Sequence, residues 1–328
     1  MTSRQPPAFH AQGRVPFWRR TPPSVFPPLM GLFGLALAWE RAAEPLGVPR
    51  AVSEMLLGAV VMLFLFALAA YLAKLAKRPA VIVEDLRILP GRAGLAAGPM
   101  CIMVVSPGLV PHAPALGRWL LFGGLVAHGG LAVRVVHGLL TGPVEARQVT
   151  PVWHLSFVGF IVAPLSAAPL GFTGLAQAVL AGTAAAAALI YGVSLAQLIR
   201  RNPPPPLRPL LAIHVSPLAL CGTASLLLGL TGFAVVFAGL ASLVVAMLLL
   251  NARYLTAAGF SPLWGAFTFP LAAYAGLMLG LAGHGAIFGA VGGLGLVAGT
   301  VLIPWIAARI LQMWARGALA AKTNAAQA

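Results

Sequence analysis

Residues 208–229 (RPLLAIHVSPLALCGTASLLLG) form an apolar run with a proline, Pro217, near its centre. The run has no acidic residue, and its length matches the roughly 20 residues that a helix needs to cross a hydrocarbon core. A proline inside a helix removes an N–H donor and displaces the carbonyl one turn back, so the helix bends. We therefore predict a kinked membrane-spanning helix at this place.

The same apolar character extends over the chain of 328 residues, which is 60% hydrophobic and only 8% charged. A soluble domain carries about 25% charged residues, so this composition excludes a soluble enzyme, a secreted mini-protein and a disordered chain. We predict an all-α integral membrane protein with ten transmembrane helices, arranged as five antiparallel hairpins. The predicted spans are 24–40, 53–75, 93–110, 116–139, 151–170, 174–198, 208–229, 232–251, 262–282 and 286–312. These spans form a pore domain at 24–312, between an N-terminal tail (1–23) and a C-terminal tail (313–328).

The first run has a second interpretation, because residues 36–38 (ALA) resemble a signal-peptide cleavage site and follow a pair of arginines. Pro27 and Pro28 interrupt the apolar run, however, and its removal would leave nine spans with termini on opposite sides. We therefore expect an uncleaved first span.

The charge balance predicts the orientation. The chain has 21 Lys and Arg against 6 Asp and Glu, a net charge of +15. In a soluble protein this excess would suggest a nucleic-acid partner, but cytoplasmic loops of membrane proteins also collect Lys and Arg. With the N-terminus inside, 18 of the 21 cations face the cytoplasm, and the other three are Arg41, Arg50 and Arg118. We predict a multi-pass protein of the bacterial inner membrane, with both termini cytoplasmic and no nucleic-acid partner.

One cytoplasmic group of cations, Lys74, Lys77 and Arg78, is expected to be a solvated cluster that contacts anionic membrane lipid.

Catalytic chemistry has no assembled site in this sequence. No acidic residue follows Glu145, so over half of the chain lacks a carboxylate for a general base, a metal ligand or a proton relay. There is no phosphate-binding loop, dinucleotide glycine pattern or His-Glu-x-x-His motif. Cys101 and Cys221 lie within apolar runs and are typical of buried hydrophobic residues. We predict that the protein is not an enzyme and has no cofactor or metal.

Prolines mark alternate spans, from the first to the ninth. Unsatisfied backbone groups are tolerated in lipid only where they are buried in protein or line a watery cavity. The odd-numbered helices should therefore line a central pore, with the even-numbered helices outside. The predicted kink residues are Pro28, Pro99, Pro164, Pro217 and Pro270.

Polar and small residues accompany these prolines. Serine and threonine hydroxyls would face the pore, although small residues also let helices pack closely, and both interpretations remain open. His154 and His214 lie on the fifth and seventh spans, where they are candidates for proton coupling or neutral groups bonded to a neighbouring helix. The hydroxyl candidates are Ser166, Ser216, Thr223 and Thr268.

Four segments together resemble the tellurite-resistance/dicarboxylate transporter family, which includes bacterial TehA and the plant slow anion channels of guard cells. The resemblance covers about 24–312, nearly the whole chain. The segments are 27–39 (PPLMGLFGLALAW), 151–168 (PVWHLSFVGFIVAPLSAA), 207–225 (LRPLLAIHVSPLALCGTAS) and 260–275 (FSPLWGAFTFPLAAYA).

The resemblance implies a homotrimer of ten-helix subunits, each with its own conduit for anions. In these relatives a phenylalanine on the ninth helix plugs the pore, and the matching residue here is Phe269. The long regulatory tails of the plant proteins are missing, so regulation through them is not carried over. We expect an anion channel; the alternative is a secondary carrier, with or without proton coupling, for a C4-dicarboxylate, sulfite or a tellurite-type oxyanion.

Overall fold

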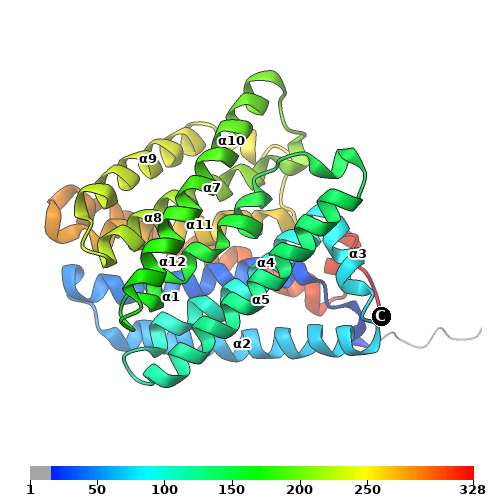
Figure 1. Ribbon diagram of the computed structural model, residues 1–328, viewed down its shortest axis with the longest axis horizontal. Helices are drawn as coiled ribbons and strands as arrows, with labels where there is room; N and C mark the ends of the chain where they lie inside the picture. Colours follow the sequence, from blue (N-terminus) through cyan, green and yellow to red (C-terminus); the bar gives the residue numbers. More distant parts are fainter. Residues whose placement is uncertain (1–15) are drawn as a thin grey trace, which may run out of the picture.

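The computed structural model (Figure 1) describes residues 16–328, apart from the side chains of residues 145 and 146. Most of the predicted N-terminal tail, including Arg4 and Arg14, therefore lies outside the described residues. Every regular element in the described part is helical, and no strand occurs there.

Eight helices are long and apolar enough to cross a membrane, which makes the chain a multi-pass membrane protein. Two of them begin as 3₁₀ helices (η6 and η7) and continue as α-helices. The eight are α2 (Arg50–Lys77), α4 (Leu89–Leu109), α5 (Pro114–Thr141), α7 (Thr173–Arg200), η6 (Pro205–His214) with α8 (Val215–Leu227), α9 (Thr231–Leu250), η7 (Pro262–Phe267) with α11 (Thr268–Gly280), and α12 (Ala286–Ala315).

The other two predicted spans differ from these eight. The first corresponds to α1 (Phe26–Leu46), which carries Glu40, Arg41 and Glu44 in its last turns. The fifth is broken into η4 (His154–Val158), η5 (Gly159–Val162) and α6 (Pro164–Ala167), and together they form a shorter apolar segment. The count of ten spans therefore stays a prediction. Short helices complete the chain: η1 (Phe17–Arg20), η2 (Pro23–Val25), α3 (Val81–Arg87), η3 (Val144–Arg147), α10 (Ala252–Leu255), η8 (Ala282–His284) and α13 (Ala318–Lys322).

Burial divides the eight long helices into two groups. In their most apolar stretches, 72% of α4, 83% of η6 with α8 and 61% of η7 with α11 is buried. The corresponding share is only 17–28% for α2, α5, α7, α9 and α12. In Figure 1, α2 lies along the bottom edge and α9 at the upper left, with α4, α8 and α11 between them. The third, seventh and ninth predicted spans are thus inner helices, and the even-numbered spans are outer ones.

Most prolines of the odd-numbered spans lie at the start of an α-helix, and not in the middle of one. Only Pro99 lies well inside a continuous α-helix. Pro28 is in the first turn of α1, and Pro164 is the first residue of α6. Pro217 and Pro270 are the third residues of α8 and α11, directly after η6 and η7. The reason is that the first turn of an α-helix leaves N–H groups without intrahelical partners, so a missing N–H costs little there.

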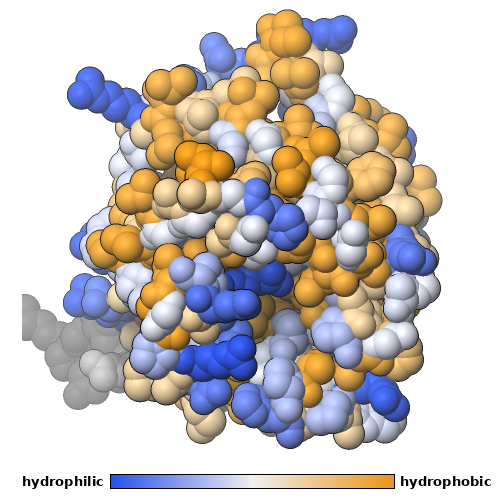
Figure 2. Space-filling view, turned by 90° about the vertical axis from the view of Figure 1, so that its left-hand side faces the viewer, coloured by the Kyte–Doolittle hydropathy of each residue, from blue (hydrophilic) through white to orange (hydrophobic). Residues whose placement is uncertain are grey.

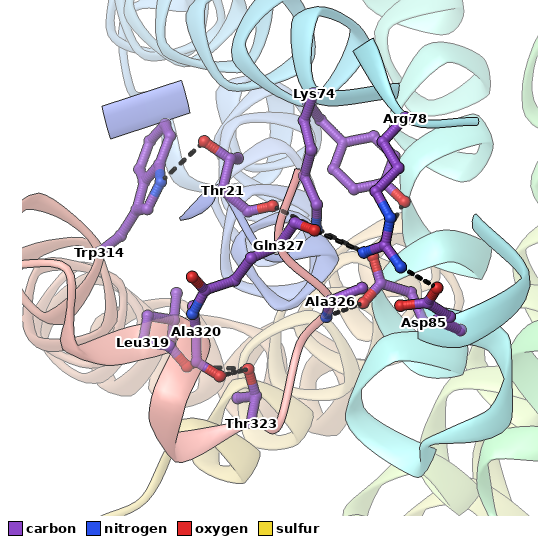
Figure 3. Close-up of polar contacts among 12 residues, drawn as sticks. Thr21, Lys74, Arg78, Asp85, Trp314, Leu319, Ala320, Thr323, Ala326 and Gln327 are labelled. Carbon is purple, nitrogen blue, oxygen red and sulfur yellow. Dashed lines mark hydrogen bonds and ion pairs between the residues drawn. The ribbon is translucent and has the colours of Figure 1, made fainter. Parts of the chain in front are cut away.

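Lys74 was expected in a solvated cluster, and that prediction is wrong. Its side chain is fully buried and pairs with the equally buried Asp85, with Nζ 3.1 Å from Oδ2 (Figure 3). Nζ also donates to the carbonyl oxygen of Thr21 at 3.1 Å, and the other carboxylate oxygen of Asp85 accepts from the backbone N–H of Ala326 at 2.9 Å. The Lys74–Asp85 pair therefore connects α2 and α3 with the segments that contain Thr21 and Ala326.

A second close contact joins α1 to α11. A methyl group placed on Gly31 would overlap the side chain of Thr268, and one placed on Gly34 would lie 3.0 Å from Cδ2 of Phe269. Farther along the same faces, Ala38 lies opposite Gly276. Small residues on α1 thus let the two backbones approach and fix the position of the first turn of α11.

We predict that Asp85→Ala destabilises the protein by about 3–5 kcal/mol, because it leaves the Lys74 charge buried without its partner. Glu84→Ala is the matched control, because it breaks the ion pair between Arg78 (side chain 45% exposed) and Glu84 (38% exposed). This change should lower the free energy of unfolding by at most about 1 kcal/mol. Reversible unfolding in mixed micelles measures both. Equal losses for the two variants would contradict the structural role of the buried pair.

We also predict that Gly31→Ala lowers the free energy of unfolding by about 1–3 kcal/mol, since the added methyl group forces α1 away from α11. The control is Gly58→Ala on α2, where an added methyl group meets nothing within 4 Å. That change should be neutral or stabilise by up to about 1 kcal/mol through helix propensity. The same unfolding assay tests the pair, and a tolerated Gly31→Ala would argue against close contact at this seam.

Candidate functional site

Three cavities follow one another along α1, from its N-terminal to its C-terminal end. The first, here the inner cavity, has a volume of about 50 Å³ and lies at the end that the predicted topology places toward the cytoplasm. Met30 of α1, Ala97 of α4, Ser216 of α8 and Phe269 of α11 are among its lining residues. No charged residue lines this cavity, so its surface is almost entirely apolar.

The second, the middle cavity, lies on the other side of Phe269 and has a volume of about 30 Å³. The third, the outer cavity, has about 260 Å³ and reaches the loop ends at the far side of the helices. The middle and outer cavities share Leu37, Arg41 and Leu165, so they meet at these side chains. Figure 2 looks onto this end of the molecule and shows a hollow with hydrophilic residues around it.

Phe269 is the residue that the linings of the inner and middle cavities have in common. Its side chain is 6% exposed, and it is the second residue of α11, between the end of η7 and Pro270. Gly34 of α1 leaves the space that the ring fills. The change from 3₁₀ to α-helix and the close approach of α1 thus place one aromatic ring between two cavities.

The predicted hydroxyl residues occupy different places. Ser216 lines the inner cavity and Thr223 the middle cavity. Thr268 is fully buried and donates to the carbonyl oxygen of Gly265 at 2.7 Å, so its hydroxyl serves the turn before α11. Ser166 is also fully buried, and its hydroxyl has no hydrogen-bond partner among the described residues.

The predicted prolines are also divided. Pro270 lines the inner cavity, and Pro217 lines a small apolar space beside it. Pro28, Pro99 and Pro164 lie outside the linings of the inner, middle and outer cavities. These three therefore shape helices that surround the cavities.

The structure brings His154 and His214 together, which their separation of 60 positions did not indicate. His154 Nε2 and His214 Nδ1 are 3.0 Å apart, with one nitrogen donating and the other accepting. The hydroxyl of Tyr191 donates to the carbonyl oxygen of His214. Both histidines are almost fully buried, and His154 Nδ1 and His214 Nε2 have no hydrogen-bond partner in the described part of the chain. This geometry agrees with the interpretation of histidines bonded to a neighbouring helix.

His214 also lines a separate cavity of about 660 Å³ at the C-terminal end of α7. Arg200 and Arg201 lie in its lining, together with the buried Ser194. The histidine pair thus lies between this cavity and the small apolar space beside the inner cavity, which His154 lines.

Sequence reasoning missed Arg41 as a site residue and counted it only among the three outer cations. It follows Gly34, Leu37 and Ala38 at helical spacing, and all four line the middle cavity. The helical spacing of these residues could have indicated that Arg41 lies on the cavity side of α1. The structure was needed to show that this side faces Phe269, through the contact with Gly34.

The described residues contain no group of three or more His, Cys, Asp or Glu side chains that would hold a metal ion. Cys101 and Cys221 are buried, as predicted.

The sequence matches the family model described as voltage-dependent anion channel (SLAC1) over residues 20–313. No curated protein matches the chain closely enough to be reported as a relative. The family match covers nearly the whole length and confirms the resemblance noted in the sequence. The chain therefore belongs to the voltage-dependent anion channel family, whose members are anion channels or transporters.

Proposed function

We propose that the protein is an anion channel that conducts small anions through a conduit within each protomer, closed by the side chain of Phe269. The observation that carries this proposal is the position of the Phe269 ring, which lines both the inner and the middle cavity. The three cavities lie between helices of one chain, which supports a conduit within each protomer.

The lining supports anions as the conducted species. No acidic residue lines the inner or middle cavity, and the one charged residue in these two linings is Arg41. An aromatic ring across a narrow apolar passage blocks ions by its bulk and by excluding water. Small anions with a low cost of dehydration would pass most readily once the ring moves.

We propose further that the channel lies in the bacterial inner membrane as a homotrimer, with both termini in the cytoplasm. The excess of Lys and Arg in the predicted cytoplasmic segments supports this orientation.

Replacing Phe269 tests the proposed gate. Phe269→Ala should raise the anion current in planar bilayers by roughly tenfold or more, which corresponds to a barrier lowered by about 1.4 kcal/mol or more. The matched control is Phe267→Ala, because Phe267 lies two positions earlier, packs against Trp264 and lies outside the linings of both cavities.

An ion-replacement series on the same bilayers identifies the current as one carried by anions. The gate is refuted if Phe269→Ala conducts no better than the parent protein, or if Phe267→Ala increases the current equally.

A secondary carrier is the second candidate, and the buried pair of His154 and His214 favours it. The pair joins η4 to η6, and His214 lines the cavity at the end of α7. A proton carried by this pair would couple transport to a pH gradient.

His154→Gln and His214→Asn separate the two candidates, because each keeps a hydrogen-bonding atom near the nitrogen that forms the pair and removes the titration. If the protein is a channel, both variants keep currents that vary linearly with voltage and ignore a pH gradient. Saturable, pH-driven uptake into proteoliposomes that disappears in either variant would instead establish the carrier.

A further inference from the structure

Arg41 lies on the face of α1 that lines the proposed conduit. Gly34, Leu37 and Ala38 share this face with it and line the middle cavity, so the arginine comes about two turns after Gly34, which lies against Phe269. Arg41 also lines the outer cavity. Its guanidinium group therefore lies where an ion arriving from the outer side would meet the approach to Phe269.

Two glycines of α11 make room for this side chain. A methyl group on Gly276 would lie 3.5 Å from Cδ of Arg41, and one on Gly280 would lie 3.0 Å from Nη1. The glycines are four positions apart, so they form one face of α11. The arginine side chain lies along this face, with Cδ beside Gly276 and Nη1 beside Gly280.

The other charged groups around the outer cavity already have partners. Glu40 accepts from the hydroxyl of Ser53 at 2.5 Å and pairs with Arg50, with 3.6 Å between Oε1 and Nε. Glu54 lies 3.7 Å from Nε2 of His112. Arg41, in contrast, has no ion pair or hydrogen bond with any described residue. Arg41 is thus the charged side chain of these linings that has no partner among the described residues.

A guanidinium group has five N–H donors and no acceptor, and beside a cavity it needs water or an anion to satisfy them. Its planar fork suits oxygen atoms held in one plane. Thr223, whose side chain carries a hydroxyl donor, lines the same middle cavity.

We propose that Arg41 forms a binding site for a small monovalent anion at the junction of the middle and outer cavities. The site rests on the proposed function only in that the bound anion is one that permeates. It collects anions on the outer side of Phe269 and repels cations, and it favours a planar oxyanion over a halide because of the guanidinium geometry.

Bilayer recordings in the Phe269→Ala background test the site, because that background should conduct. Arg41→Gln removes the charge, and Arg118→Gln is the matched control: it removes an exposed cation from the same side that does not line the cavities. Under a NaCl gradient, Arg41→Gln should move the reversal potential toward zero and raise the half-saturating outer chloride concentration roughly tenfold. Arg118→Gln should change neither. If Arg41→Gln matches Arg118→Gln, the site does not exist.

A binding assay separates failure of the site from failure of the channel. The purified protein should be more stable to heat in nitrate than in gluconate at the same ionic strength, since a ligand that binds the native state stabilises it. This gain should vanish in Arg41→Gln and persist in Arg118→Gln. A gain that depends on Arg41 without any current would overturn the channel and keep the site. If the protein conducts anions but neither its selectivity nor its thermal stability in nitrate depends on Arg41, the site is overturned and the channel is kept.

Arg41→Lys keeps the test open if Arg41→Gln does not fold. Lysine retains the charge but presents no planar fork. Chloride selectivity should therefore survive, while the preference for nitrate over chloride should fall severalfold. An unchanged preference would contradict recognition by the guanidinium group.

Discussion

Helix α1 packs so closely along α11 that Gly31 and Gly34 have no room for a side-chain carbon facing Thr268 and Phe269. This contact places the aromatic ring between the inner and middle cavities, and the same faces continue outward to Arg41 and Gly280. Without small residues on α1, the first turn of α11 would stand farther away and the ring would no longer fill the passage. The proposed conduit would therefore be a consequence of helix packing between α1 and α11.

The inner helices reach this arrangement by changing helix type. In η6 with α8 and in η7 with α11, a 3₁₀ stretch precedes an α-helix, and a proline stands in the first turn of the α part. Backbone groups freed at such a junction need partners, and an outer helix facing lipid offers none. The outer helices are accordingly continuous, with only 17–28% of their apolar stretches buried, while the broken helices lie inside. The breaks in the inner helices and their burial both follow from the need to satisfy the backbone groups that a break leaves without partners.

Local patterns in the sequence predicted much of this, and long-range pairings account for the rest. Apolar run length located the eight long helices, and the alternation of prolines distinguished inner from outer segments. The partner of Lys74 could not be read in the same way: Asp85 lies in a short helix after a turn, and the site is completed by Thr21 and by the returning C-terminal segment. A count of loop cations treats Lys74 as solvated because hydropathy carries no information on pairing. The contact between His154 and His214 was hidden for the same reason.

The pairings between charged side chains determine which charges are left without a partner near the cavities. Glu40 and Glu54, which line the outer cavity, contact Ser53, Arg50 or His112, and Asp85 pairs with Lys74 and lines none of the three cavities. Arg41 thus stands without a partner, whereas its neighbours Glu40 and Arg50 form an ion pair with each other. Fields from exposed charges fade within about 10 Å at ordinary salt, whereas a cation beside a narrow apolar cavity is screened far less. In the proposed channel, we therefore expect Arg41 to act on an ion near Phe269 more strongly than the many cations of the predicted cytoplasmic loops.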